Sequence, residues 1–239
     1  KADDSPITEA DLAAHKIICP GLEKLLPGVP VLSEESEIPD YEIRASWQRY
    51  WIVDPLDGTK EFIRRNGEFT VNIALVERGV PVLGVVYVPV SGVSYMGLQG
   101  TGAFKLEAGK EMPIAVRSMA DRAQSGQPVM VVASRSHGAE KVERLLSKIS
   151  ETLGEVDTRN MGSSLKLCLV AEGAADIYPR LAPTCEWDTA AAQAVVEAAG
   201  GQVLDDQLSV MRYNTKADLL NPFFYVIGDT DYNWSKLLS

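Results

Sequence analysis

The chain has 239 residues, of which 46% are apolar and 23% charged, the composition of an ordinary globular protein. Its 33 acidic and 23 basic residues give a net charge of −10, which argues against a nucleic-acid polymer as partner. No apolar run reaches the roughly 18–20 residues of a membrane-spanning helix. The three cysteines lack C-x-x-C spacing, which indicates free thiols in a reducing compartment. Because Lys1 is an unusual first residue, we expect the natural chain to start earlier.

The first predicted element is a helix capped by Ser5 or Thr8. Its apolar face comprises Leu12, Ala14, Ile18, Leu22, Leu25 and Leu26. Pro20 and the glycine after it predict a kink or a division into two helices. Asp11 is interpreted from the pattern alone as a first-turn acid that complements the helix dipole.

Two short apolar strands are then followed by acidic residues. The strand at 30–33 leads into Glu34 and Glu35, and the strand at 50–53 leads into Asp54. Neighbouring strands that end in this way would bring their carboxylates to one place. A solvated acidic loop over 34–42 remains the alternative.

A tight segment follows Asp54. Pro55 cannot continue a strand ladder, so we expect the chain to turn and bring Asp57 close to Asp54. Gly58 allows close backbone approach, and Thr59 is placed at a helix N-terminus. Two neighbouring carboxylates favour a divalent cation, and oxygen ligands favour magnesium or manganese over zinc. An ordinary Asx turn with a helix cap is the alternative.

The middle of the chain has the alternating pattern of an antiparallel sheet, which we expect the first helix to cover on one face. The predicted strands are 69–76, 82–88, 93–96 and 103–106. Residues 107–127 are polar and interpreted as a linker.

The remaining chain alternates between strands and helices, which predicts a largely parallel sheet. The expected strands are 128–133, a short one at 156, 175–178, 203–204 and 223–227, and the expected helices are 140–149, 165–171 and an alanine-rich one opened by Asp188. Gly200 and Gly201 would end that last helix.

Several other residues could bind an anion. Ser163 and Lys166 lie in a glycine-led helix start that can cradle phosphate, and Arg180 can grip phosphate with two hydrogen bonds. The segment 134–137 is either a capped loop with a surface histidine or a further contact. The chain contains neither a P-loop motif nor a G-x-S-x-G elbow.

The string Asp54-Pro55-Leu56-Asp57-Gly58-Thr59 resembles the metal-binding signature of the inositol monophosphatase superfamily of magnesium-dependent, lithium-sensitive phosphatases. The continuation Lys60-Glu61-Phe62 is similar to the branch of CysQ-type 3'(2'),5'-bisphosphate nucleotidases. The motifs around Asp11, at Glu34-Glu35 and at 186–191 fit the same superfamily, in the same order.

This resemblance implies an α/β (α+β) protein with the layered αβαβα sugar-phosphatase fold. An antiparallel sheet and a largely parallel sheet would have helices between and outside them. The N-terminal α+β half would span 1–115 and the C-terminal α/β half 116–239, with the active site between them.

The resemblance also implies roles for particular residues. Two or three magnesium ions, replaceable by manganese, would be held by Glu34, Asp54, the carbonyl of Leu56, Asp57 and Asp188. Asp11 and Thr59 would be catalytic and activate water. The substrate would contact Glu34, Leu56, Asp57, Gly58, Thr59, Ser163, Lys166, Arg180 and Asp188.

The implied activity is hydrolysis of the 3'-phosphate of 3'-phosphoadenosine 5'-phosphate to AMP and phosphate, with the phosphosulfate form as a second substrate. It implies a link to sulfur assimilation and a cytoplasmic protein, with peripheral association with the inner membrane also open. Monomer and homodimer both stay open. The alternatives are an inositol or sugar monophosphatase with the same metal core, and a metal-binding regulatory relative without turnover.

Overall fold

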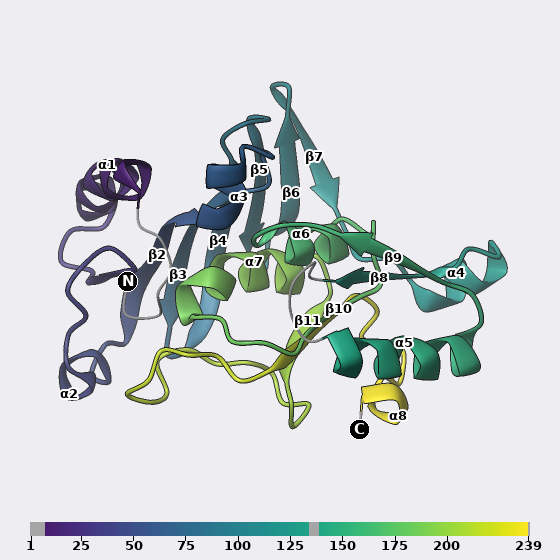
Figure 1. Ribbon diagram of the computed structural model, residues 1–239. Coiled ribbons are helices and arrows are strands. Elements are labelled where there is room, and N and C mark those ends of the chain that lie inside the picture. The colour runs from purple at the N-terminus through teal and green to yellow at the C-terminus, as the bar shows by residue number, and fades with distance from the viewer. Residues whose placement is uncertain (1–7, 134–138, 239) are drawn as a thin grey trace.

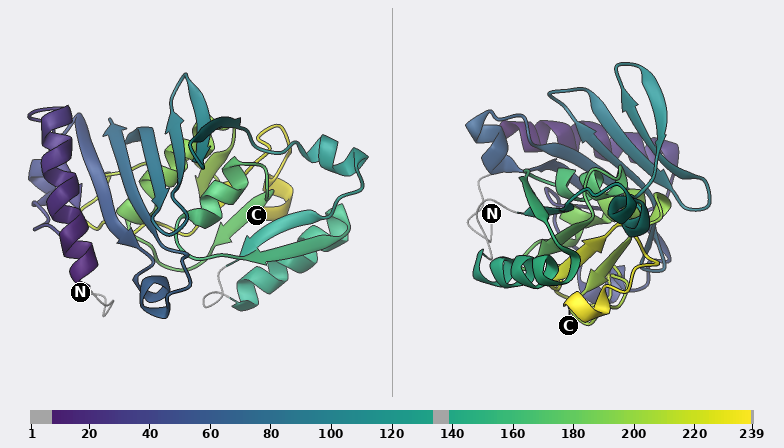
Figure 2. Two further views of the ribbon diagram at one scale, coloured as in Figure 1. Left: turned by 90° about the horizontal axis from the view of Figure 1, so that it is seen from above. Right: turned by 90° about the vertical axis from the view of Figure 1, so that its right-hand side faces the viewer.

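The computed structural model describes residues 8–133 and 139–238. Helices and sheets alternate in layers: α1 (Glu9–Leu25), a seven-stranded sheet, α6 (Leu165–Ala171) with α7 (Glu186–Ala198), a five-stranded sheet, and α5 (Ala139–Leu153) with α8 (Ser235–Leu238) (Figures 1 and 2). This arrangement confirms the predicted αβαβα fold. Within the described ranges, no helix is long and apolar enough to cross a membrane.

The seven-stranded sheet contains the predicted antiparallel meander. Its strands lie in chain order: β1 (Val31–Ser33), β2 (Arg49–Asp57), β3 (Thr70–Glu77), β4 (Val80–Val88), β5 (Val93–Leu98), β6 (Gly102–Glu107) and β7 (Lys110–Ile114). Only β1 and β2 pair in parallel. A short helix, α2 (Tyr41–Arg44), lies in their connection, where the sequence analysis predicted no element.

Alternate side chains of β2 pack on opposite faces of this sheet. Trp51 and Val53 pack with Leu22 of α1, whereas Tyr50 and Ile52 belong to the large core that includes α7. Both faces are therefore covered by helices, which explains why β2 is apolar throughout rather than alternating.

Helix α1 is one continuous element that contains Pro20, so of the two predicted outcomes, a kink or a division into two helices, the division is wrong. Proline removes a single helical hydrogen bond, and packing against β2 offsets that loss. Thr8 caps the helix through its hydroxyl oxygen, which accepts the N–H groups of Ala10 and Asp11. Ser5, the other predicted cap, lies outside the described residues.

The segment expected to be a linker contains β7 and helix α4 (Met119–Gln124). Ala108 and Gly109 both have positive φ angles, 50° and 75°, and form a two-residue hairpin turn into β7. The sequence pattern missed β7 because this edge strand is mostly exposed and carries Pro113.

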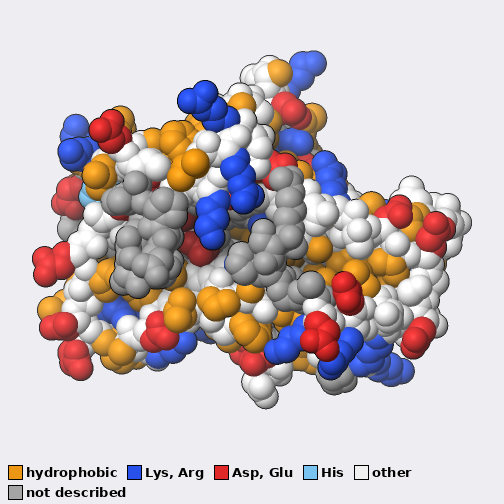
Figure 3. Space-filling view, in the orientation of Figure 1, with side chains coloured by type: hydrophobic (Ala, Val, Ile, Leu, Met, Phe, Trp, Pro, Cys, Tyr) orange, Lys and Arg blue, Asp and Glu red, His pale blue; other side chains and the backbone are white. Residues whose placement is uncertain are grey.

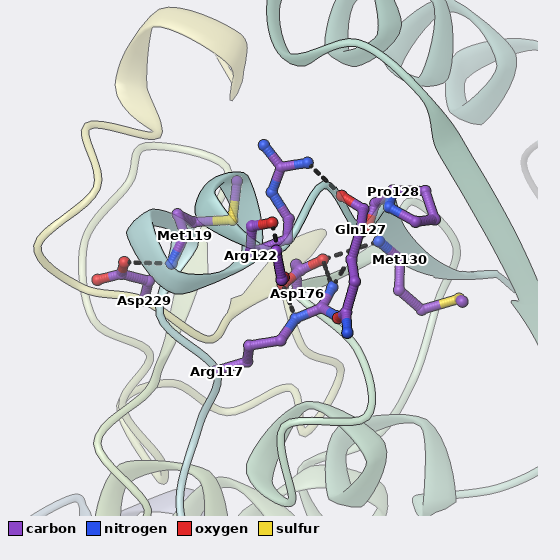
Figure 4. Close-up of polar contacts among 9 residues, drawn as sticks. Arg117, Met119, Arg122, Gln127, Pro128, Met130, Asp176 and Asp229 are labelled. Carbon is purple, nitrogen blue, oxygen red and sulfur yellow. Dashed lines mark hydrogen bonds and ion pairs between the residues drawn. The ribbon is translucent and has the colours of Figure 1, made fainter.

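Polar contacts hold the segment that connects β7 of the first sheet to β8 of the second (Figure 4). The Nε of Arg117 donates to Asp176 at 2.9 Å, and the Met130 N–H donates to the same carboxylate at 2.7 Å. At the start of α4, the N–H of Met119 donates to Asp229 at 2.7 Å.

The five-stranded sheet has the order β11 (Gln202–Asp205), β12 (Phe224–Ile227), β10 (Ile177–Arg180), β8 (Val129–Ala133), β9 (Val156–Asn160). Strands β10, β8 and β9 are parallel, but β12 runs antiparallel to both of its neighbours. The sheet is therefore more mixed than predicted, because the last crossover is a long loop rather than a helix.

Two facing glycines allow α7 to lie directly on the first sheet. Gly84 and Gly97 are cross-strand partners on β4 and β5. A Cβ atom at Gly84 would lie 2.0 Å from the carbonyl oxygen of Ala191, and one at Gly97 would lie 2.5 Å from the Cα of Val195. This close approach fixes α7, whose first turn carries Asp188, against the sheet whose strand β2 carries Asp54 and Asp57.

Candidate active site

Glu34 and Asp54 leave the first sheet side by side. Ser33 pairs with Val53 in the parallel register of β1 and β2, and the Glu34 N–H donates to the Val53 carbonyl at 3.1 Å. The two carboxylates are close enough for the charge of Glu34 to raise the pKa of Asp54. The expectation that two acid-terminated strands bring their carboxylates together is confirmed for this pair.

The segment after Asp54 forms a bulge rather than a clean strand end. Asp54 pairs with Asn72 and Asp57 pairs with Thr70, so three steps on β2 match two on β3. The expectation that pairing stops at Pro55 is therefore wrong, because a bulge absorbs the missing N–H and the ladder resumes. The Leu56 N–H donates to Asp54 Oδ1 at 2.9 Å, which closes the Asx turn that was the alternative interpretation.

Asp188 reaches the same place from α7. Cys185 is the residue before this helix, and its N–H donates to Asp188 Oδ2 at 2.8 Å. Asp188 is thus the third helical residue, reaching back to the helix start, rather than the residue that opens the helix. Strands β3 to β10 lie between Asp57 and Asp188 in the sequence, so the position of Asp188 beside Asp57 depends on the α7 packing described above.

Asp54, Asp57 and Asp188 form a compact carboxylate cluster. One oxygen from each lies within 4.8 Å of the others, and Asp54 is buried. Three carboxylates this close repel one another strongly unless a cation or protons lie between them. All three donors are hard oxygen atoms, so the cluster fits a divalent ion of the magnesium type. The Leu56 backbone is buried in the same bulge.

Burial and mutual repulsion shift the titration of the cluster. Burial, with the carboxylates of Glu34, Asp57 and Asp188, raises the pKa of Asp54 well above its ordinary value. Burial, followed by the charge of Asp57, raises the pKa of Asp188 to about 8. Without a cation the cluster therefore retains protons at neutral pH, and a bound divalent ion must displace them.

This linkage predicts how pH affects the metal-free protein. The protonated form of Asp188 stabilises the fold fully below its ordinary pKa of 3.8, and the stabilisation is lost as pH rises towards about 8. In EDTA the melting temperature should therefore fall between about pH 5.5 and 7.5, by about 2–4 °C per kcal/mol lost. Magnesium should remove that fall, so the difference in melting temperature between the two conditions should grow with pH. A difference that is constant over this range would contradict the prediction.

Ser164 connects the acids and was not singled out from the sequence. Its N–H and its hydroxyl both lie 2.6 Å from Asp57 Oδ2, and the hydroxyl lies 2.7 Å from the backbone oxygen of Asp188. Asn72 donates to the same hydroxyl at 2.7 Å. Ser164 lies directly before α6. Because it contacts both Asp57 and Asp188, it links the part of the cluster on the first sheet to the part on α7. The motif Gly162-Ser163-Ser164 pointed to this segment, but its pattern favoured Ser163.

Asp11 is buried as the third residue of α1. Its Oδ2 accepts the Thr8 N–H at 2.9 Å in a capping box. One turn later, His15 Nδ1 lies 2.9 Å from Ser33 Oγ, next to Glu34. Residues four apart share a helix face, so Asp11 lies on the face of α1 that meets the end of β1. Thr59 is half-buried as the first residue of α3 (Thr59–Arg64), and Gly58 before it has φ 92°.

A cavity of about 380 Å³ opens beside the cluster. Its lining includes Asp57, Gly58 and Asp188, together with three predicted substrate contacts, Ser163, Lys166 and Arg180. It therefore joins the candidate metal site to the anion-binding candidates.

Lys166 is buried in the cavity wall and already has backbone partners. Its ammonium donates to the carbonyl of Ser163 at 2.6 Å and to that of Met161 at 3.3 Å. Burial lowers its pKa to about 8. Arg180 donates to the Pro183 carbonyl at 3.0 Å. Lys166 thus holds the loop 161–163 in place.

Two basic residues that the sequence analysis did not select, Lys60 and Arg64, line the cavity from α3. Lys and Arg side chains gather in the middle of the face drawn in Figure 3, over this helix. The segment 134–137, a further candidate contact, lies outside the described residues.

Comparison with known proteins identifies the family to which the chain belongs. The sequence profile of the inositol monophosphatase family matches residues 1–225. The chain therefore belongs to the inositol monophosphatase family, which is metal-dependent.

Within this family, the chain is highly similar to several proteins that share one name. The 3'(2'),5'-bisphosphate nucleotidase CysQ of Salmonella typhimurium is 53% identical over 226 residues, covering 95% of this chain and 87% of the relative. The Haemophilus influenzae protein of the same name is 36% identical and covers 99% and 86%. The crystal structure of CysQ from Bacteroides thetaiotaomicron aligns with a TM-score of 0.79 at 46% identity, covering 95% and 86%.

Proposed function

We propose that this protein is a magnesium-dependent 3'(2'),5'-bisphosphate nucleotidase that converts 3'-phosphoadenosine 5'-phosphate into AMP and phosphate. The observation that carries the proposal is a cavity lined both by Asp57 and Asp188 of the carboxylate cluster and by the basic residues Lys60, Arg64, Lys166 and Arg180. A substrate with two phosphates needs both features. The high identity to proteins named CysQ supports the same substrate class.

Two or three magnesium ions, or manganese in their place, would be held by the carboxylates of Glu34, Asp54, Asp57 and Asp188 and the carbonyl of Leu56. When bound, they supply Lewis-acid stabilisation of the phosphoryl group and a water of lowered pKa. The protein orients these ligands through Ser164, the Asx turn at Asp54 and the capping hydrogen bond of Asp188.

The remaining roles fall to groups around the cluster. The hydroxyl of Thr59 and the carboxylate of Asp11 would orient the attacking water and hold its proton. The backbone N–H groups of Gly58 and Thr59 would bind oxygens of the phosphate being hydrolysed. Ser163, Lys166 and Arg180 would form the wall that receives the rest of the nucleotide.

The proposal also covers organisation and context. The halves 1–115 and 116–239 would each contribute to the site: Asp54 and Asp57 come from the first half, Asp188 from the second. We place the enzyme in the cytoplasm, linked to sulfur assimilation, with lithium as inhibitor. Its three cysteines are free thiols, which fits a reducing compartment.

A substrate panel tests the proposal against its rival, an inositol or sugar monophosphatase. With magnesium, kcat/KM for 3'-phosphoadenosine 5'-phosphate should exceed that for inositol 1-phosphate by at least about a hundred-fold, because the smaller substrate leaves the basic wall unused. The phosphosulfate form belongs in the same panel. Equal or better turnover of inositol 1-phosphate would favour the rival, and no turnover of any phosphate ester would favour a regulatory protein.

A further inference from the structure

Glu186, the first residue of α7, is a buried acid that the proposed mechanism does not use. The residue is 2% exposed, and the N–H of Asn214 donates to its carboxylate, with both oxygens 2.9 Å from the nitrogen. The backbone N–H of Glu186 donates to the carbonyl of Leu219 at 2.9 Å. The start of α7, two residues before Asp188, is therefore attached to the long connection between β11 and β12.

Arg44 of α2 contacts the same connection from the side of the first sheet (Figure 1). It is 1% exposed, and its guanidinium donates to Asn214 Oδ1 at 2.6 Å and to the carbonyl of Ala217. The side-chain amide of Asn214 donates in return to the carbonyl of Arg44 at 2.6 Å. The hydroxyl of Tyr41, also on α2, donates to the carbonyl of Thr215 at 2.9 Å.

Asn214 thus bridges a buried cation and a buried anion. Its backbone N–H donates to Glu186, and its side chain exchanges two hydrogen bonds with Arg44. A buried charge is costly unless a charge of opposite sign and hydrogen bonds compensate it. The arrangement is therefore strongly favoured over any displaced one, and it fixes α2, the connection and the start of α7 relative to one another.

This network joins the chain segments that carry candidate cation ligands. Helix α2 lies between Glu34 and β2, whereas Glu186 lies on the same helical turn as Asp188. One carboxylate oxygen of Asp188 accepts the N–H of Cys185, so its orientation depends on the geometry of that turn. A shift at the start of α7 would move this carboxylate away from the rest of the cluster.

We propose that Arg44, Asn214 and Glu186 are positioning residues, which hold the first turn of α7 so that Asp188 is preorganised to bind a divalent cation. This inference rests on the proposed function, because it takes Asp188 as a cation ligand. The cavity is lined, and the carboxylate cluster is formed, by other residues. The three residues therefore act on cation affinity, and the chemical step is unchanged once the cation site is full.

Variants of two residues disturb this arrangement in different ways. Asn214→Gly removes the side chain that contacts Arg44 and keeps the N–H that donates to Glu186. Glycine readily adopts the φ of 55° found at this position, so the backbone need not change. Arg44→Met removes the guanidinium while keeping side-chain length, and Arg44→Lys restores the charge without the planar fork.

Arg117→Met is the matched control at the other end of α7. Arg117 donates to the buried carboxylate of Asp176 at 2.9 Å and, as Arg44 does, to a backbone carbonyl. The N–H of the preceding Val116 donates at 3.1 Å to the carbonyl of Ala199, which directly follows α7. Loss of Arg117 should therefore destabilise the fold without reaching the first turn of the helix.

The measured quantities are the magnesium dissociation constant, from calorimetric titration of metal-free protein, and the magnesium concentration that gives half-maximal hydrolysis. Asn214→Gly and Arg44→Met should each raise both about ten-fold, as expected for residues that orient a metal ligand. Arg44→Lys should raise them only about three-fold. At saturating magnesium, kcat should stay within about three-fold of the wild type. Arg117→Met should lower the melting temperature in EDTA but leave the dissociation constant within about two-fold.

The inference and the proposed function fail in different ways. If the wild type binds magnesium and hydrolyses the bisphosphate nucleotide, but Asn214→Gly and Arg44→Met keep its dissociation constant, the positioning role is wrong and the proposed function stands. If Arg117→Met weakens magnesium binding equally, the effect is general destabilisation, and the inference is also overturned. If the wild type binds no magnesium, the proposed function is wrong and this inference with it. Should Arg44→Met not fold, Asn214→Gly decides, because it retains both buried charges.

Discussion

Asp54→Asn, Asp57→Asn and Asp188→Asn should each abolish magnesium-dependent hydrolysis of 3'-phosphoadenosine 5'-phosphate while leaving a folded protein. Each substitution removes one carboxylate from a cluster in which one oxygen of each residue lies within 4.8 Å of the others. An amide oxygen can still accept the hydrogen bonds from Ser164 to Asp57 and from Cys185 to Asp188. Local structure should therefore survive, and the loss should come from weaker cation binding.

Melting temperatures in EDTA and in magnesium separate cation binding from misfolding. In EDTA the variants should be at least as stable as the wild type, because one repelling carboxylate is gone. Magnesium should raise the melting temperature of the wild type and have little effect on the variants. Asp157→Asn, at an exposed position of β9, is the matched control and should behave as the wild type. Full activity in all three cluster variants would contradict the assignment of these aspartates as metal ligands.

Thr59→Ala should lower kcat by about 10²–10⁴-fold, the range for a positioned proton-transfer group. The side chain is half-buried at the start of α3, two residues after Asp57, and its deletion leaves every carboxylate in place. KM should therefore change little. Thr59→Ser keeps the hydroxyl and should retain most of the activity. If KM rises and kcat is unchanged, Thr59 binds substrate instead of assisting the chemical step.

The carboxylate end of the site could be predicted because local signals determine it. Glu34 and Asp54 each come directly after a short apolar run, and the parallel pairing of the two runs brings these residues together. Gly58 and Thr59 have the turn and helix-start chemistry that the structure shows. The first residues of α7 likewise carry a recognisable helix-start pattern around Asp188.

Other features depend on contacts that no local pattern encodes. Ser164 meets Asp57 only because the loop before α6 lies over β2 and β3, and Ser163 beside it has the same local chemistry. Lys60 and Arg64 are indistinguishable in sequence from a solvated helix face. The direction of β12 depends on a long loop without regular periodicity, so it could not be predicted. The need for glycine at positions 84 and 97 becomes visible only when α7 packs over them.

The most direct test of this account identifies the product of 3'-phosphoadenosine 5'-phosphate by chromatography after incubation with magnesium or with EDTA. Because the carboxylate cluster receives the 3'-phosphate and the basic wall the 5'-phosphate, the account predicts AMP with its 5'-phosphate intact and one equivalent of phosphate. Both should form only with magnesium. Formation of adenosine 3'-monophosphate, or equal turnover in EDTA, would contradict the account.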